Sequence, residues 1–309
     1  MELAKGKPIE ITDKPLFDDY FRKFPPEVSE LTFTNLFIWR YYYNFRFLEW
    51  DDHLIIFSNE YFKTRKESIS KDKQTILLYP PIGPNSVEII LNLFETIKNL
   101  EVHRVPNAIM EELRASKRAE TLNIAWKEDR ANWDYIYEKR KLAELPGAKL
   151  YHKRRWVKRF QELYPDFQFH LISEEWIEIC RQLQIEWCDM NECRLHEDLL
   201  EEQKAITEAL DNYTELKFRG GLLCVQEKSI AYTFGELLNP NTVVIHIEKA
   251  LTEYEGAYQA INNLFSKNCC EIADFINREQ DLGDPGLRHS KDSYFPHHMV
   301  EKSIIYHNI

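Results

Sequence analysis

The sequence predicts an α/β protein of the α+β type, organised as two tandem domains of similar architecture. Each domain is expected to hold a mixed, mostly antiparallel sheet flanked by helices. The chain has 309 residues, about two typical domain lengths, and 44% of them are hydrophobic, enough for sizeable cores. In both halves, strand-like apolar runs and helical patterns follow one another in the same order.

The first half is expected to form three strands, a helix, a strand, a short helix and further strands. The residues Asp51-Asp52-His53 separate two apolar runs, as in a hairpin. The proline-rich stretch 80–84 ends the third strand, and Ser86 has the position of a helix N-cap. The expected strands are 45–50, 54–58, 76–79, 102–105, 122–126 and 133–137, and a short helix is expected at 108–116.

The second half repeats this order after a join near Pro146-Gly147, which gives expected domains at 1–147 and 148–309. Tyr254, Tyr258 and Ile261 recur with helical spacing and therefore share one face of a helix. The expected strands are 222–225, 230–236, 243–248, 270–276 and 299–306, and amphipathic helices are expected at 173–183 and 195–210.

Composition excludes several classes of function. The formal net charge of 40 − 51 = −11 excludes a surface that binds polyanions all round, so no duplex-DNA partner is expected and a phosphate site needs a local basic patch. The chain has 9 glycines and no glycine-rich phosphate loop, and it lacks the HExxH and G-x-S-x-G motifs. We therefore expect neither a metal site nor a nucleophilic Ser or Cys.

Localisation is expected to be cytoplasmic. The six cysteines contain no C-x-x-C pair and are expected to be free, buried thiols in a reducing compartment. Residues 1–7 lack the apolar stretch of a signal peptide, and no run of 18 apolar residues could form a membrane span.

Residues 149–160 form the first candidate site segment, because six of them are Lys or Arg in an otherwise acidic protein. As a helix, this segment would dock through Trp156 and Phe160 and turn a basic face outward. Such a face can bind phosphates. Its candidate contacts are Lys153, Arg154 and Arg155. The alternative is a solvated helix that balances neighbouring acidic residues.

Residues 277–288 form the second segment, which follows a strand and carries charges of both signs around two glycines and a proline. Loops at strand ends commonly hold polar site residues. Arg278 or Arg288 can bind a carboxylate or a phosphate, whereas Glu279 or Asp281 can bind an amine or accept a proton. The alternative is a hydrogen-bonded structural loop.

A third segment, 245–258, joins a strand to a helix. The strand ends at Glu248 and Lys249, and the helix that follows carries Tyr258. The N-terminus of such a helix offers free N–H groups to an anion or a developing oxyanion. The alternative is an ordinary β–α connection.

A fourth segment, 33–43, is rich in aromatic residues. Helical spacing brings Asn35 and Trp39 together, as in the wall of an aromatic pocket. The alternative is an aromatic stripe that belongs to the core.

The second segment carries a family resemblance. Asn277 and the residues after it, together with Lys291 and Lys302, resemble the C-terminal signature of a bacterial DUF2156 family, which is related to the C-terminal domain of phosphatidylglycerol lysyltransferases. The similar positions are 277–288, 291, 293–294 and 300–302, and the stretches 33–39, 149–160 and 248–262 are similar too. The resemblance therefore covers most of the chain.

The resemblance implies two tandem GNAT-like domains, in agreement with the repeated order of elements. It also implies kinship with Fem-type transferases, which move an amino acid from aminoacyl-tRNA to an amine or a lipid hydroxyl. The sequence does not include the membrane-spanning half of the lysyltransferases. A soluble protein is therefore expected, with a small amine, a peptide or a lipid as acceptor.

GNAT acetyltransferases carry a [QR]-x-x-G-x-[GA] loop for the pyrophosphate of acetyl-CoA. The corresponding residues here are 253–258, with Glu253 in place of Gln or Arg and Tyr258 in place of Gly or Ala. An anionic Glu253 and a bulky Tyr258 both oppose the close approach of a pyrophosphate. We therefore expect no cofactor, and acetyl-CoA or another acyl-CoA is disfavoured.

Three functions remain open. The first is transfer of an aminoacyl group from aminoacyl-tRNA, or from another phosphate-bearing donor, to an amine or a hydroxyl, with Glu248 or Glu279 as proton acceptor or amine anchor. The expected anion contacts are Arg278, Arg288 and Lys302, with Lys153, Arg154 and Arg155 for donor phosphates. The alternatives are a CoA-dependent N-acyltransferase and a non-catalytic protein that binds an amino acid or a peptide. The sequence leaves open which domain holds the site.

Overall fold

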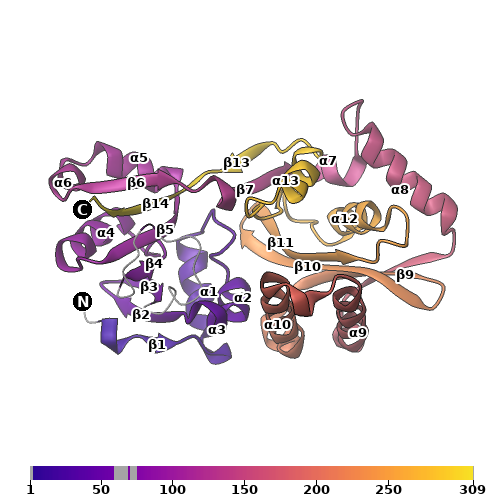
Figure 1. Cartoon of the computed structure of the whole chain (residues 1–309), viewed down its shortest axis with the longest axis horizontal. Coiled ribbons are helices and arrows are strands. Elements are labelled where there is room, and N and C mark those ends of the chain that lie inside the picture. The colour runs from indigo at the N-terminus through magenta and orange to yellow at the C-terminus, as the bar shows by residue number, and fades with distance from the viewer. Residues whose placement is uncertain (1–2, 59–68, 70–74, 309) are drawn as a thin grey trace. The chain divides into compact units, whose positions relative to one another are not determined.

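The computed structural model describes residues 3–58, 69 and 75–308 and divides into two compact units (Figure 1). Unit 1 comprises Met1–Asp134, Gln280–Gly283 and Val300–Ile309, and unit 2 comprises Tyr135–Glu279 and Asp284–Met299. Within the described residues, each unit holds a seven-stranded sheet. This architecture confirms the predicted fold class of two mixed, mostly antiparallel sheets with helices.

The sheet of unit 1 has the strand order β1-β2-β3-β4-β5-β14-β6. Its neighbouring strands pair antiparallel, except for the parallel pair β4–β5, which helix α4 connects. The strands are β1 (Lys7–Pro8), β2 (Arg46–Trp50), β3 (His53–Ser58), β4 (Ile76–Leu78), β5 (Leu100–Pro106), β6 (Ile124–Glu128) and β14 (Lys302–His307). The helices are α1 (Lys14–Lys23), α2 (Phe33–Ile38), α3 (Arg40–Tyr43), α4 (Ser86–Thr96), α5 (Asn107–Ala115) and α6 (Lys117–Thr121).

Local sequence explains the hairpin β2–β3 and the start of α4. Asp51 and Asp52 have φ values of 51° and 56°, the conformation of a two-residue type I′ turn. Ser86 is the first residue of α4 rather than its N-cap, because Asn85 occupies the cap position. The Ser86 hydroxyl donates instead to the Pro81 carbonyl at 2.7 Å. The predicted helix is therefore present, with its cap one residue earlier.

The sheet of unit 2 has the strand order β13-β7-β12-β11-β10-β9-β8. Helix α12 connects the parallel pair β11–β12, and the pairs β12–β7, β11–β10, β10–β9 and β9–β8 are antiparallel. The strands are β7 (Asp134–Glu138), β8 (Phe167–Leu171), β9 (Arg219–Val225), β10 (Lys228–Asn239), β11 (Thr242–Ala250), β12 (Phe275–Asn277) and β13 (His298–Val300). The helices are α7 (Lys139–Glu144), α8 (Tyr151–Leu163), α9 (Glu174–Met190), α10 (Glu197–Asp211), α11 (Tyr213–Leu216), α12 (Ala257–Asn268) and α13 (Pro285–Asp292).

A β-bulge in β11 takes His246 out of the regular strand pairing. Two consecutive residues of β10 pair with Ile247 and Ile245, so His246 is the extra residue between them. Gly235 of β10 permits this approach, because a Cβ at that position would clash with the Val244 carbonyl. The bulge sets the position of an imidazole that belongs to the candidate site.

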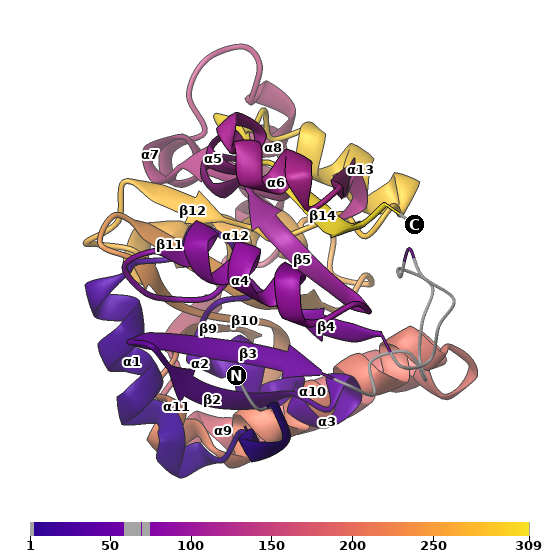
Figure 2. The ribbon, with the colours of Figure 1, turned by 90° about the vertical axis from the view of Figure 1, so that its left-hand side faces the viewer.

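Segments of the two units alternate along the chain, which corrects the expected domains 1–147 and 148–309. Strand β14 lies beside β5 (Figure 2) and inserts between β5 and β6 of unit 1 (Figure 1). Strand β7 pairs with β12 in unit 2. The chain accordingly passes between the units after residues 134, 279, 283 and 299. Pairing between distant strands decides this division, and no local composition change marks it.

Two smaller expectations are also wrong. The strand expected at 270–276 is limited to β12, because the Ala273 N–H donates to the Cys270 carbonyl at 3.1 Å and closes a turn before the strand. Cys188 and Cys193 form a disulfide, since the turn after α9 brings their Cα atoms within 5.1 Å. The other four cysteines are free and buried, as predicted.

Candidate functional site

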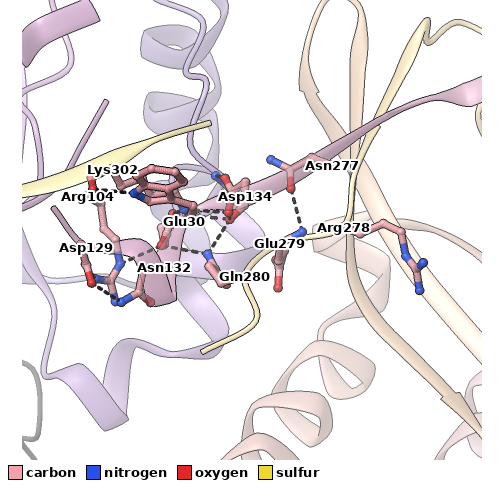
Figure 3. A network of polar contacts seen from close by, with 12 residues as sticks. Glu30, Arg104, Asp129, Asn132, Asp134, Asn277, Arg278, Glu279, Gln280 and Lys302 are labelled. Atoms are coloured by element: carbon pink, nitrogen blue, oxygen red, sulfur yellow. Dashed lines mark hydrogen bonds and ion pairs between the residues drawn. The ribbon is translucent and has the colours of Figure 1, made fainter. Parts of the chain in front are cut away.

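The candidate site in unit 2 is built on the loop that follows β12. Asn277 ends this strand and is fully buried. Its side-chain oxygen accepts a hydrogen bond from the Glu279 N–H at 2.7 Å (Figure 3), and Glu279 has a positive φ of 55°. This side-chain-closed turn fixes the backbone of the loop. Arg278 and Glu279 each contact a residue of β11 from it.

Arg278, Glu248 and Asn262 form the centre of the site. The Arg278 Nη2 donates to Glu248 Oε1 at 2.8 Å, and the Asn262 Nδ2 donates to Glu248 Oε2 at 2.8 Å. Burial opposes the charged guanidinium, but the Glu248 carboxylate outweighs burial and raises the pKa of Arg278. A strand, a helix and a loop thus converge on one carboxylate.

Tyr294 packs against two cations of this site. The Arg278 Cζ lies 4.9 Å from the centre of the Tyr294 ring, and the Lys153 Nζ lies 4.2 Å from it. No carboxylate among the described residues forms an ion pair with Lys153. Burial, and then the charge of Arg278, lower the pKa of Lys153 to about 8. We call Arg278, Glu248, Asn262, Tyr294 and Lys153 the Arg278 cluster.

Two buried atoms of the Arg278 cluster have no hydrogen-bond partner among the described residues. They are the Arg278 Nη1, a donor, and the Asn262 Oδ1, an acceptor. A buried polar group without a partner costs about 1–3 kcal/mol, so a native protein normally satisfies it with water, an ion or a ligand. The cluster can therefore offer a donor and an acceptor, on either side of Glu248, to a bound molecule.

His246 forms a second polar group on β11. Its Nε2 lies 2.9 Å from Glu236 Oε1 and its Nδ1 lies 2.8 Å from Glu279 Oε1. Burial alone would lower the pKa of His246, but hydrogen bonds with the two carboxylates raise it to about 9. His246 is therefore protonated at neutral pH and does not act as a general base.

Lys249 and Tyr258, both predicted site residues, are held by internal contacts in unit 2. The Lys249 Nζ pairs with Glu202 of α10 at 2.6 Å and lies 3.8 Å from the ring centre of Trp187 on α9. The Trp187 Nε1 in turn donates to the Tyr258 hydroxyl at 3.1 Å. Burial raises the pKa of Tyr258. These contacts connect the end of β11 to helices α9 and α10.

Helix α8 holds the basic segment and turns most of its basic side chains outward, as expected, but Trp156 does not dock it. Phe160 is buried, but Trp156 is 44% exposed, which corrects its expected role in docking the helix. Arg154 donates to two backbone carbonyls just after α7, at 2.5 and 3.2 Å. Of the three predicted phosphate contacts, Arg155 is exposed, Arg154 supports the backbone, and Lys153 belongs to the Arg278 cluster.

The residues that align with a GNAT pyrophosphate loop pack against α8. Gly256 is the N-cap of α12 with a φ of 85°, and a Cβ there would lie 2.7 Å from the Trp156 carbonyl oxygen. Glu255 pairs with Arg159 of α8 at 3.4 Å. The first turn of α12 thus meets a carbonyl group and an ion pair of a neighbouring helix.

Lys302 lies in unit 1, in a buried ionic network (Figure 3). Its Nζ contacts Glu30 at 2.5 Å and Asp134 at 2.7 Å, and its side chain has no exposed area. Arg104 joins the network by pairing with Glu30 at 2.8 Å and with Asp129 at 2.6 Å. Burial raises the pKa of Glu30, and the Lys302 charge opposes this effect. Lys302 therefore neutralises internal carboxylates, which corrects its expected role as an open anion contact.

The remaining candidates are dispersed. Asp281 is buried in unit 1 and pairs with Arg130 at 3.0 Å. Asn35 donates to the backbone carbonyl of residue 29 at 3.2 Å, and Trp39 packs against tyrosines of α3. Arg288 lies on α13 of unit 2 and is half-buried. The contacts of Asp281 and Asn35 thus stabilise the folded structure of unit 1.

Sequence reasoning missed Asn262, Tyr294 and Glu236 as site residues. Asn262 lies one helical turn after Tyr258 on α12, so the spacing of this helix was a usable signal. Tyr294 follows α13 and Glu236 lies on the strand beside β11. Only the tertiary structure brings these two residues to the site.

The part of the chain that the structure describes contains neither a candidate metal site nor a candidate membrane span. No group of three His, Cys, Asp or Glu side chains there could hold a metal ion. None of the helices there combines the length and the apolar character that crossing a bilayer requires.

The two mixed sheets, each with a helix between its parallel strands, define a protein with a tandem GNAT-like fold. The chain belongs to the family of the phosphatidylglycerol lysyltransferase C-terminal domain, whose family model matches residues 21–306. The predicted family resemblance is therefore confirmed over most of the chain.

Solved structures agree with this family and fold. A conserved protein of unknown function from Bacteroides thetaiotaomicron VPI-5482 has 32% identity and a TM-score of 0.86, covering 97% of this chain and 98% of that chain. The C-terminal DUF2156 domain of a protein described as a lysylphosphatidylglycerol synthetase, from Agrobacterium fabrum, has 10% identity and a TM-score of 0.65, covering 97% of this chain and 93% of that chain. No curated protein matches the chain.

Proposed function

We propose that this protein is an acyltransferase that moves an aminoacyl group from aminoacyl-tRNA to an amine or hydroxyl acceptor. The observation that carries the proposal is the Glu248 carboxylate, held between the guanidinium of Arg278 and the carboxamide of Asn262. Membership of a family named for a lysyltransferase supports an amino-acid residue as the transferred group. A lysyl group is therefore the first donor to test.

The proposed reaction needs alignment and proton transfer. The nitrogen or oxygen of the acceptor attacks the ester carbonyl carbon of the donor, a new C–N or C–O bond forms, and the ester bond to the ribose oxygen breaks. The proton leaves the acceptor for Glu248 and passes to the departing ribose oxygen. Because the ester is already activated, a proton acceptor and an aligned nucleophile supply most of what catalysis requires.

Glu248 is the proposed proton acceptor in preference to Glu279. Both carboxylates contact a cation, Glu279 through His246 and Glu248 through Arg278, so the surroundings of each carboxylate decide between them. Each Glu248 oxygen accepts one hydrogen bond and has lone-pair capacity for another. The free Oδ1 of Asn262 lies beside it and can accept a hydrogen bond from the same amine.

The exposed basic residues of α8 are the proposed contacts for donor phosphates outside the cluster. Arg155 is exposed on this helix, and the net charge of the whole chain is −11, so the attraction has to be local. Charge reversal in Arg155→Glu should weaken donor binding and flatten its dependence on salt concentration. An unchanged salt slope would speak against this contact.

A transfer assay tests the proposed function. The pure protein is incubated with tRNA charged with labelled amino acids, lysine first, and with a cell extract of acceptors, and label leaving the tRNA is followed. We expect protein-dependent transfer into a new product, reduced about 100-fold or more by Glu248→Gln. Glu271→Gln, at an exposed turn of the same unit, is the matched control and should retain activity.

Melting temperatures of both variants separate a chemical effect from unfolding. No transfer above the spontaneous rate, under conditions in which an active lysyltransferase works, would refute aminoacyl transfer.

Two alternatives have specific support and specific outcomes. A CoA-dependent N-acyltransferase is supported by the GNAT-like fold, but the Trp156 carbonyl next to Gly256 opposes a pyrophosphate at the start of α12. A non-catalytic amino-acid or peptide binder is supported by the free donor and acceptor on either side of Glu248. Micromolar CoA binding would favour the first, and tight amino-acid binding without turnover would favour the second.

A further inference from the structure

The Arg278 cluster has a surplus of positive charge that the proton-transfer chemistry does not use. We propose that Lys153, Arg278 and Tyr294 form a subsite for a phosphate oxyanion of the substrate. This inference deepens the proposed function and rests on it for the identity of the substrate. The subsite lies entirely within unit 2.

The geometry gives the subsite two cations and one aromatic wall. The Lys153 Nζ and the Arg278 Cζ lie 4.2 and 4.9 Å from the centre of the Tyr294 ring, and Tyr294 is 4% exposed. Cation–π contacts of this kind hold the cations in place without neutralising them. The ring therefore leaves the positive charge of Lys153 available to an anion.

The charge balance favours an anion. Glu248 neutralises Arg278, whereas no described carboxylate pairs with Lys153. Such a local surplus is unusual in a chain with a net charge of −11. An anion would offset the two effects that lower the pKa of Lys153, burial first and then the charge of Arg278.

An unused hydrogen-bond donor points to the same place. Arg278 Nη1 is buried and has no hydrogen-bond partner among the described residues, although Nη2 is bound to Glu248. The side chains of Lys153 and Arg278 are both partly exposed, so each cation of the cluster is in contact with solvent.

The proposed donor has phosphate as its anionic group. The carboxyl group of an aminoacyl donor is esterified and uncharged, so the nearest negative charges belong to phosphates of the nucleic acid. Arg and Lys together bind phosphate oxygens well, the first through directed N–H groups and the second as a mobile point charge. A free carboxylate would instead fit the non-catalytic amino-acid binder.

Amine labelling of the whole protein near pH 8 tests the subsite. Lys153 is partly deprotonated there, so an amine-reactive reagent labels it, and peptide mass spectrometry compares it with Lys158 on the same helix. Inorganic phosphate and adenosine 5′-monophosphate should slow the labelling of Lys153 severalfold, whereas labelling of Lys158 should be unchanged. Acetate at equal ionic strength should have little effect.

Matched variants give an independent reading. Lys153→Met should weaken the binding of adenosine 5′-monophosphate, measured by calorimetry, by about tenfold. Lys158→Met, which removes an exposed lysine paired with Glu162, should leave it unchanged. Melting temperatures of both variants confirm that they are folded.

Each outcome has one meaning. Failure of both phosphate probes to protect Lys153 overturns the subsite, whatever the transfer assay shows. Equal protection by acetate overturns the phosphate assignment and favours the amino-acid binder. Protection by the phosphate probes together with a negative transfer assay supports the subsite and overturns the proposed function.

Discussion

Lys302 of unit 1 and Lys153 of unit 2 illustrate two uses of a lysine inside a protein. The Lys302 ammonium touches two carboxylates, Glu30 and Asp134, and has no exposed area. Lys153 is half-buried, lies against Tyr294 and shares its surroundings with another cation, Arg278. The first lysine is neutralised by its own fold, and the second is not.

This difference separates a structural network from a binding site. In unit 1, Arg104, Glu30 and Asp129 extend the pairing of Lys302, so that charges of both signs satisfy one another. In unit 2, Lys153 forms no ion pair with a described carboxylate; a buried polar atom without a partner does not separate the units, because Asn132 of unit 1 has one as well. A buried charge by itself says little about function, whereas a cation without a carboxylate partner indicates where an anionic ligand can add contacts.

The strongest test of the comparison is Lys302→Met. Removing the ammonium leaves Glu30 and Asp134 buried without their cation, and the free energy of unfolding should fall by about 3–5 kcal/mol. Urea unfolding followed by circular dichroism measures the change. A loss below about 1 kcal/mol would mean that solvent reaches these carboxylates and that the network is not balanced by Lys302.

Deprotonation of His246 at high pH should have the next largest effect on the free energy of unfolding. Its folded-state pKa of about 9 lies above the unfolded value near 6.5, so the folded state binds more protons between these values. The stabilisation that the charged His246 supplies is complete below pH 6.5 and is lost as the pH rises through 9, by on the order of 3 kcal/mol.

Urea unfolding at several pH values measures this loss. His246→Gln should flatten the profile between pH 6.5 and 9. A wild-type profile with no decline in that range would contradict a charged His246 between Glu236 and Glu279.

Arg278→Lys should have an intermediate effect. Lysine keeps the charge but loses the planar fork that binds Glu248 and lies over Tyr294, so stability should fall by about 1–2 kcal/mol. Arg140→Lys, in an exposed pair with Glu144, is the matched control and should be close to neutral. Equal effects in the two variants would show that the guanidinium geometry of Arg278 is unimportant.

Lys153→Met should have the smallest effect, and one of opposite sign. It removes a cation that is disfavoured by burial and then by the charge of Arg278, so the free energy of unfolding should rise by up to about 1 kcal/mol at neutral pH. Because the folded-state pKa is lowered to about 8, the wild-type protein should recover relative to the variant as the pH rises from 8 towards 10.5. Marked destabilisation at neutral pH would contradict the charge surplus.

Local sequence predicted the individual helices and strands better than it predicted which unit each of them belongs to. Asp51-Asp52 and the apolar spacing of α4 are local signals, and both elements are present. The exchange of β7 and β14 depends on pairing between strands far apart in the sequence. The disulfide at Cys188 depends on a turn after α9, which the spacing of cysteines does not reveal.

For the site, residue chemistry indicated the right segments more often than the right contacts. Lys153, Glu248 and Arg278 come from three different predicted segments, and the structure brings them together. Lys302 is predicted from its charge and its place in the family signature, but its partners Glu30 and Asp134 are distant in sequence. A sequence shows the sign of a side chain's charge, whereas only the tertiary structure shows whether a partner neutralises it.

The place of β14 in the unit 1 sheet also affects how the chain can fold during synthesis. A ribosome releases every segment of unit 2, up to residue 299, before the strand that separates β5 from β6 becomes available. The sheet of unit 1 therefore remains incomplete, with unpaired edges at β5 and β6, until residues 302–307 emerge. The half of the protein that is synthesised first is thus the half that can be completed last.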